Sequence, residues 1–252
     1  MGVGILEKNK VPGGALQSFK RKGIVFDTGI HYIGGLDTGQ NLNQYFRYFG
    51  LIDKINIRRL NQNRFDMIAL GDKEYPLAQG FDNFIDQLLP YFPDCKKTLE
   101  KYISTIKEIA SSFPLYNFEF PGNPSEETFR NKSAFDFYHS LQTTNADIKH
   151  SGSWNETCSI FSSVLAGNSF LYAGNKDKTP LYIPALINHS FISSAWRPVD
   201  GSSQIADLLI QSIIEAGGTI IKNTKVNGIR YTNDTFYIST DPGESFFSKY
   251  LL

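Results

Sequence analysis

The first 35 residues limit the choice of fold more than any other part of the chain. An apolar stretch, Gly4-Ile5-Leu6, ends in the acidic Glu7, and a short polar stretch then leads to the pair Gly13-Gly14. A buried strand that ends in a carboxylate and precedes paired glycines is typical of the second half of a dinucleotide-binding βαβ unit. In such units the acidic side chain accepts hydrogen bonds from a ribose, and the glycines let the backbone approach a phosphate or a ring.

The strand and the G-x-G-x-x-G turn that open such a unit do not stand before this segment. Gly2 and Gly4 match two of the glycines, but Glu7 occupies the third position. We therefore expect an incomplete nucleotide-binding unit in a truncated chain that also lacks a C-terminal part. The last segment, from Phe246 to Leu252, has the pattern of a strand that would return to the nucleotide-binding domain.

The segment from Phe19 to Gly29 alternates between apolar and polar residues, which predicts a β-hairpin. Ile24 and Phe26 would lie on its half-buried face. His31 follows shortly after the hairpin.

Near the other end of the chain, the clearest helix runs from Gln204 to Ala216 and stops at Gly217-Gly218. Ser202 or Ser203 is expected to cap its N-terminus. A strand from Thr219 to Ile221 and a hairpin from Lys225 to Thr240 complete this region.

The middle of the chain predicts antiparallel strands joined by a turn at Gly71-Asp72, followed by a series of helices. The expected helices lie near residues 81–89, 99–113, 133–141, 157–165 and 184–194, with a loop at 118–128. The fold class is mixed α/β. Residues 1–50 plus 195–252 would form an incomplete Rossmann-like domain. It would enclose an inserted domain, residues 51–194, rich in helices and antiparallel sheet.

Composition excludes some functions and leaves others open. Lys plus Arg and Asp plus Glu both total 25, so the chain carries no net charge, and nothing supports nucleic-acid binding. The 20 Phe and 13 Tyr would suit a cavity for a long apolar ligand, although a core built on Phe is the simpler explanation. Cys95 and Cys158 lie far apart without metal-ligand spacing, so we expect no metal site, no disulfide and a cytoplasmic location.

Two segments resemble the phytoene desaturase and retinol saturase group of FAD-dependent oxidoreductases. The first runs from Glu7 to Gly14 and continues from Phe26 to Gly34. The second runs from Arg197 to Ala206 and on through the helix to Ile229. The resemblance implies an FAD cofactor, with NAD(P) as a further candidate. It implies hydride transfer to or from a carbon–carbon bond of an apolar, carotenoid- or retinoid-like polyene. Residues 51–194 would then be the substrate domain, and the protein could contact a membrane peripherally.

The resemblance also implies which residues lie at the adenosine end of FAD. Glu7 would bind the ribose, and Gly13 and Gly14 would let the chain pass close to the cofactor. Val226 would offer main-chain hydrogen bonds to the adenine. Without the resemblance, Glu7 reads as a surface charge, the glycines as a tight turn and Val226 as a core valine.

At the flavin end, the resemblance places Asp27, Gly29 and His31 near the ring, and Gly201 where the backbone approaches the isoalloxazine. His31 is the candidate for a proton-transferring or substrate-orienting group. A histidine beside an aromatic-rich strand is more often a structural hydrogen-bonding residue, so no catalytic residue is assigned.

Two other functions fit the sequence. An inactive, truncated fragment could bind an apolar ligand or a partner without flavin, and the missing pyrophosphate-binding turn favours this reading. An amine-oxidase-type flavoprotein shares the Glu and Gly-Gly elements, but the context of His31 and the start of the helix after Pro198 argue against it. The sequence carries no signal for the oligomeric state.

Overall fold

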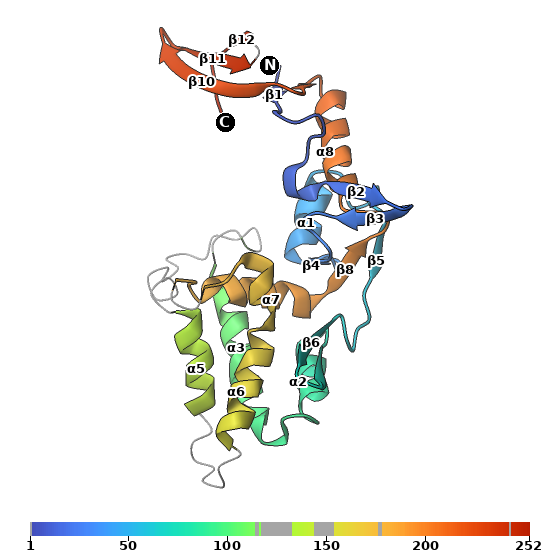
Figure 1. Ribbon diagram of the computed structural model, residues 1–252, viewed down its shortest axis with the longest axis vertical. Helices are drawn as coiled ribbons and strands as arrows, with labels where there is room; N and C mark the ends of the chain where they lie inside the picture. Colours follow the sequence, from blue (N-terminus) through green and yellow to red (C-terminus); the bar gives the residue numbers. More distant parts are fainter. Residues whose placement is uncertain (1, 114–115, 117–132, 144–153, 176–177, 242) are drawn as a thin grey trace. The chain divides into compact units, whose positions relative to one another are not determined.

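The computed structural model describes residues 2–113, 116, 133–143, 154–175, 178–241 and 243–252 (Figure 1). The chain divides into two compact units. Unit 1 comprises residues 1–31, 46–57 and 198–252, and unit 2 comprises residues 32–45 and 58–197. Both units are therefore discontinuous in sequence. Residues 32–45, which the sequence analysis placed with the cofactor-binding segments, belong to unit 2.

Unit 1 joins the two ends of the chain through a parallel strand pair. Strand β1 (Gly4–Leu6) pairs with β9 (Thr219–Ile221), and helix α8 (Ser203–Glu215) leads into β9. The backbone N–H of Glu7 extends the pairing by donating to the Ile221 carbonyl at 2.8 Å. Parallel strands need a crossover connection, and the helix-then-strand order predicted from the sequence provides it.

The predicted hairpin consists of β2 (Ser18–Arg21) and β3 (Ile24–Asp27), preceded by the short helix η1 (Gly14–Leu16). The prediction that Ile24 and Phe26 lie on the covered face of the hairpin is wrong. Ile24 and Phe26 are 60% and 43% exposed, and Phe26 stacks on Phe19 with ring centroids 5.4 Å apart. The more covered residues of β3 are Val25 and Asp27, because polar contacts of Asp27 turn that face toward the start of α8.

A three-stranded antiparallel meander completes unit 1. It consists of β10 (Lys225–Thr232), β11 (Thr235–Asp241) and β12 (Ser245–Ser248). The strand predicted near the end of the chain is present, but it pairs with β11. It therefore adds to this sheet instead of leading back to β1.

Unit 2 contains small sheets and most of the helices. Strands β4 (Ile33–Gly34), β8 (Ala195–Pro198) and β5 (Ile57–Arg59) form one sheet, and β6 (Asp66–Leu70) pairs with β7 (Lys73–Leu77). The helices are α1 (Asn41–Tyr48, which continues into unit 1), α2 (Phe81–Leu88), η2 (Pro93–Cys95), α3 (Lys96–Ser112), α5 (Ala134–Thr143), α6 (Trp154–Leu165), η3 (Gly167–Tyr172) and α7 (Tyr182–Ser193). The predicted helices are confirmed, and the predicted loop at 118–128 lies outside the described residues.

The core of unit 2 forms where α3 packs against α7 and the neighbouring helices (Figure 1). It is apolar and aromatic, because the helices place residues spaced by three and four positions on one face. Its fully buried members include Leu88, Leu99, Tyr102, Ile106, Ile109, Leu141, Phe161 and Ile192. Packing of this core therefore accounts for part of the high aromatic content of the chain.

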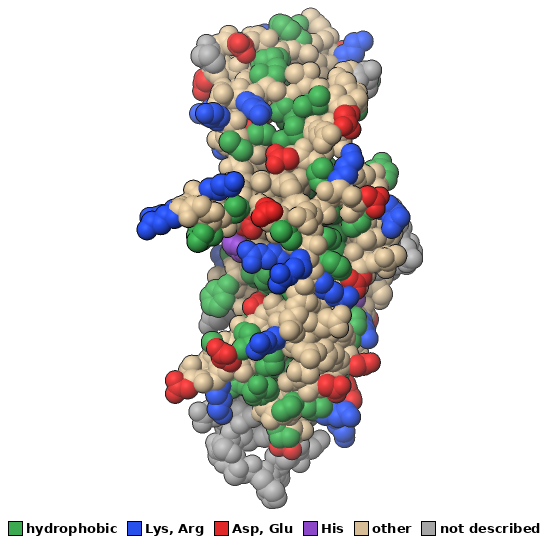
Figure 2. Space-filling view, turned by 90° about the vertical axis from the view of Figure 1, so that its right-hand side faces the viewer, with side chains coloured by type: hydrophobic (Ala, Val, Ile, Leu, Met, Phe, Trp, Pro, Cys, Tyr) green, Lys and Arg blue, Asp and Glu red, His purple; other side chains and the backbone are tan. Residues whose placement is uncertain are grey.

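The surface carries both charge signs. On the face shown in Figure 2, basic and acidic side chains are interspersed, in keeping with their equal totals. Among the described residues, none of the helices has both the length and the apolar character needed to cross a bilayer.

Candidate functional site

The candidate site in unit 1 is built around Asp27 at the end of β3. Its Oδ1 accepts three hydrogen bonds: from the Ser202 backbone N–H at 2.6 Å, the Ser202 hydroxyl at 2.9 Å and the Ser18 hydroxyl at 2.8 Å. The Ser18 oxygen in turn accepts the backbone N–H of Ser203 at 3.2 Å. The hairpin therefore satisfies N–H groups at the start of α8 that no helical carbonyl can reach.

These contacts replace the expected cap. Ser202 is the N-cap residue of α8, as predicted, but its side chain makes no capping hydrogen bond. Its hydroxyl turns to Asp27 instead, and the carboxylate takes over the role of a capping side chain. The sequence could not reveal this, because Asp27 and Ser202 are 175 positions apart.

The same contacts set the pKa of Asp27. Burial alone would raise it, but the hydrogen bonds from Ser202 and Ser18 and the nearby charge of His31 outweigh burial and lower it. Asp27 is therefore ionised at neutral pH. His31 itself is exposed.

Two of the predicted glycines are explained by close packing within unit 1. Gly13 has a φ of 113°, and a Cβ there would lie 2.9 Å from the Ala206 Cβ of α8. Gly201 has a φ of 108°, and its Cβ would lie 2.5 Å from the Ser18 hydroxyl oxygen. Both residues therefore let η1 and the hairpin approach α8.

The other two predicted glycines differ from each other. A Cβ on Gly29 would lie 2.8 Å from the Ala15 carbonyl oxygen, so the chain's own backbone fills that side. Gly14 has a φ of 51° and nothing within 4 Å of a Cβ built on it. In this set, Gly14 has room beside it for a ligand.

Glu7 lies at the carboxyl end of β1, where nucleotide-binding folds place their ribose-binding acid. Its Oε1 accepts the backbone N–H of Asn9 at 2.7 Å, and its carbonyl accepts the N–H of Thr224 at 2.8 Å. The side chain is half-buried, and no described residue donates to Oε2. The carboxylate is thus held in place by one oxygen while the other stays available.

Val226 lies on β10 opposite Thr240, beside an irregularity in the pairing that spans Val226 and Gly228. It is 37% exposed, so it is not a core valine. Its predicted main-chain contact with adenine stays a prediction.

Only some of the predicted residues therefore fit the nucleotide portion of a flavin cofactor. Glu7 offers a free, fixed carboxylate oxygen, and Gly14 offers an open backbone position. Asp27, Gly13, Gly29 and Gly201 hold the hairpin, η1 and α8 together. Among the residues that the structure describes, no group of His, Cys, Asp and Glu could hold a metal ion.

Unit 2 contains a pocket of about 390 Å³ that the sequence analysis did not find. Residues of α5, α6 and η3 contribute to its lining, which is apolar with hydroxyl groups interspersed: Ala134, Phe135, Tyr138, Ser159, Ser162, Ser163, Ala166, Ser169, Tyr172, Gly174, Asn175 and Thr179. Burial raises the pKa of Tyr172 to about 12, and that of Tyr138 is also raised. Both phenols therefore stay neutral. The pocket suits an apolar small molecule with a few polar atoms.

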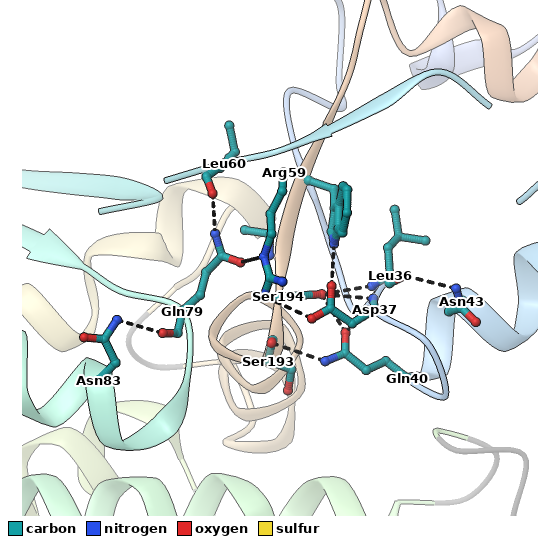
Figure 3. Close-up of polar contacts among 12 residues, drawn as sticks. Leu36, Asp37, Gln40, Asn43, Arg59, Leu60, Gln79, Asn83, Ser193 and Ser194 are labelled. Carbon is teal, nitrogen blue, oxygen red and sulfur yellow. Dashed lines mark hydrogen bonds and ion pairs between the residues drawn. The ribbon is translucent and has the colours of Figure 1, made fainter. Parts of the chain in front are cut away.

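A polar network also organises the small sheet of unit 2 (Figure 3). Asp37 forms an ion pair with Arg59 at 3.0 Å and accepts the Trp196 indole N–H at 3.0 Å. Arg59 donates from Nε to Gln79 at 3.0 Å, and Gln79 donates to the Leu60 carbonyl at 2.9 Å. Because these groups satisfy one another, the network fixes the loop after β4 against β5 and β8.

Comparison with solved structures identifies the fold. The chain superposes on an oxidoreductase from Methanosarcina mazei with a TM-score of 0.60 and 16% identity, over 98% of this chain and 52% of the other. It superposes on putrescine oxidase bound to putrescine with a TM-score of 0.61 and 13% identity, over 97% and 50%. The chain therefore shares the fold of these two oxidoreductases.

Sequence comparison then gives the family. Residues 2–252 match the family described as flavin containing amine oxidoreductase, and the chain belongs to it. Over 89% of its length it is 28% identical to all-trans-retinol 13,14-reductase from Rattus norvegicus and 26% identical to that from Danio rerio. An inactive all-trans-retinol 13,14-reductase from Danio rerio is 22% identical. The chain spans 38% of the length of each relative. The resemblance to the retinol saturase group is confirmed.

Proposed function

We propose that this chain is part of an FAD-dependent oxidoreductase that transfers hydride between the flavin and a carbon–carbon bond of an apolar polyene. Membership of the flavin family supports the cofactor. The similarity to reductases of all-trans-retinol supports a retinoid- or carotenoid-like substrate. The observation that carries the proposal is Glu7, held at the carboxyl end of a parallel strand with one carboxylate oxygen available.

In this proposal the described residues bind and position. Glu7 accepts hydrogen bonds from the ribose hydroxyls, and the open side of Gly14 admits the cofactor to the backbone. Asp27 and Ser202 hold the hairpin against α8, which keeps Gly14 in place. Hydride chemistry is supplied by the flavin when it is bound. NAD(P) as electron donor, a cytoplasmic location and peripheral membrane contact stay predictions.

The first test is a fluorescence titration of the chain with FAD, comparing the natural sequence with Glu7→Gln. A hydrogen bond to a charged group contributes about 1.5–3 kcal/mol, which corresponds to a roughly 10- to 100-fold higher Kd for the variant. Glu244→Gln, an exposed change between β11 and β12, is the matched control and should leave the Kd unchanged. Equal FAD affinities of the natural chain and Glu7→Gln would contradict the ribose-binding role of Glu7.

The substrate class needs a second assay. The chain, FAD and NADPH are incubated with all-trans-retinol, and products are separated and weighed by mass spectrometry. A product heavier by two hydrogens, formed only with FAD present, is expected. Flavin binding without consumption of the polyene would contradict the substrate class while leaving the cofactor proposal intact.

The second candidate function is an inactive fragment that binds an apolar ligand without flavin. The pocket of about 390 Å³ in unit 2 favours it, because each of its described lining residues belongs to unit 2 and none to the predicted cofactor-binding residues. In that case the FAD titration shows no saturable signal, while an apolar fluorescent probe still binds and is displaced by retinol.

A further inference from the structure

A second pocket of unit 2, of about 430 Å³, lies beside the C-terminal half of α7. Its lining is polar and consists of Gly39, Gln40, Asn41, Gln44, Tyr116, His189 and Ser193. Every lining residue other than His189 is neutral at any physiological pH.

His189 is held in a fixed orientation. Its ring lies 5.2 Å from that of Phe81 and 5.6 Å from that of Tyr116, measured between centroids. Burial, and then the charge of nearby Lys107, lower its pKa to about 4. The imidazole is therefore neutral, and one ring nitrogen must be an acceptor.

The contacts of Tyr116 decide which nitrogen that is. Its hydroxyl lies 3.1 Å from the Leu186 carbonyl oxygen and 3.2 Å from His189 Nδ1. A carbonyl can only accept, so if both contacts of the Tyr116 hydroxyl are hydrogen bonds, its single hydrogen is directed to Leu186. The contact with His189 is then favourable only if Nδ1 carries the hydrogen and donates to the phenolic oxygen. Nε2 is left as the acceptor.

Two other lining residues, Gln40 and Ser193, are engaged in hydrogen bonds within the wall of the pocket. Gln40 donates to the Ser193 carbonyl at 3.2 Å and accepts from Ser194 at 2.6 Å and from the Asp37 N–H at 2.9 Å (Figure 3). The Ser193 hydroxyl donates to the His189 carbonyl at 2.7 Å. In contrast, no described residue donates to His189 Nε2.

We propose that this pocket binds the hydroxyl group of a neutral small molecule, with His189 Nε2 accepting the hydroxyl hydrogen. The lining residues that the structure describes carry no charge that would pair with an ionic ligand, and the volume of the pocket lies within the range of small-molecule sites. All the residues belong to unit 2, and the proposal invokes no cofactor. The inference therefore stands independently of the proposed function.

The test uses the whole chain labelled with nitrogen-15 at histidine. Only four histidines are present, so His189→Gln assigns the His189 signals by their loss. The spectrum should show His189 protonated at Nδ1. Benzyl alcohol should then shift the Nε2 resonance saturably, whereas benzyl methyl ether, which has the same body but no hydroxyl hydrogen, should not.

Tyr116→Phe tests the origin of the tautomer. Removing the phenolic oxygen should lower the Nδ1-protonated fraction and weaken benzyl alcohol binding several-fold. Tyr48→Phe, an exposed change in unit 1, is the control and should alter neither. A chain protonated at Nε2, no saturable shift with benzyl alcohol, or an equal shift with the ether would overturn the proposal.

Discussion

Asp27 shows how one carboxylate can fix three segments at once. Replacing it with Asn removes the charge but keeps an acceptor, so the loss should be about 1 kcal/mol of unfolding free energy, given its partial exposure. Urea unfolding at neutral pH measures it. Asp72→Asn, in the exposed turn between β6 and β7, should change stability by less than about 0.5 kcal/mol.

The pH dependence of the same variant follows from the lowered pKa of Asp27. Its contribution is fully present above the unfolded-state value of 3.8 and is lost as the pH falls through the lower folded-state value. The difference between the natural chain and Asp27→Asn should therefore shrink below that value. A difference independent of pH would show that the charge of Asp27 does not contribute to stability.

Thr98 on α3 is a second residue whose effect on the free energy of unfolding can be tested. It is fully buried, and among the side chains that the structure describes its hydroxyl has no hydrogen-bond partner. Thr98→Val keeps the shape and removes that polar atom, so we expect stabilisation by about 1 kcal/mol. Thr105→Val on the exposed side of the same helix is the comparison, because its hydroxyl donates to the Lys101 carbonyl at 2.9 Å. A destabilised Thr98→Val would indicate that the hydroxyl is satisfied in solution.

At the scale of elements, the approach of the hairpin to α8 depends on Gly201. Gly201 and Gly243 both have a φ of 108°, but only a Cβ on Gly201 meets atoms within 4 Å. Alanine at either position meets the same unfavourable φ, so the difference between the two variants reports mainly the steric clash. Gly201→Ala should be less stable than Gly243→Ala by about 1–3 kcal/mol in thermal or urea unfolding. Equal losses would mean that Ser18 and Val25 move aside freely.

The elements were predictable where periodicity alone decides them. Helices α2, α3 and α8 each have an apolar face, and Gly or Pro follows each of them, so sequence pattern located them. The facing of the hairpin was not predictable, because alternation says which residues share a face but not which face is covered. In the folded chain, the hydrogen bonds between Asp27 and the distant Ser202 determine which face is covered.

The candidate sites show the same limit of prediction: sequence pattern does not reveal contacts between residues that are far apart in the chain. Glu7 and Gly14 could be proposed from the sequence because they lie in one short, recognisable segment. The pocket of His189 could not, because residues 39–44, 116 and 189–193 meet only in the folded unit. A histidine without a nearby ligand pattern gives no signal, and its tautomer depends on a tyrosine more than seventy positions away.

At the scale of the whole molecule, charge balance governs solubility. The calculated isoelectric point is 6.9, and large apolar side chains such as Phe19, Phe170 and Phe247 are at least half exposed. With little net repulsion near neutral pH, the chain should be least soluble close to pH 7 and more soluble at pH 5 or 9. Protein remaining in solution after concentration at each pH measures this. A solubility that only rises or only falls across the range would point to local patches instead of net charge.

The parallel pair of β1 and β9 also has a consequence for the order of folding. Gly4 and Thr219 pair directly although nearly the whole chain separates them, so closing that loop in an unfolded chain carries a large entropic cost. Contacts within residues 58–197 are more local, and collapse of that segment shortens the effective loop. We therefore expect unit 2 to acquire hydrogen-exchange protection first and the ends of the chain to join last, as pulse labelling during refolding would show.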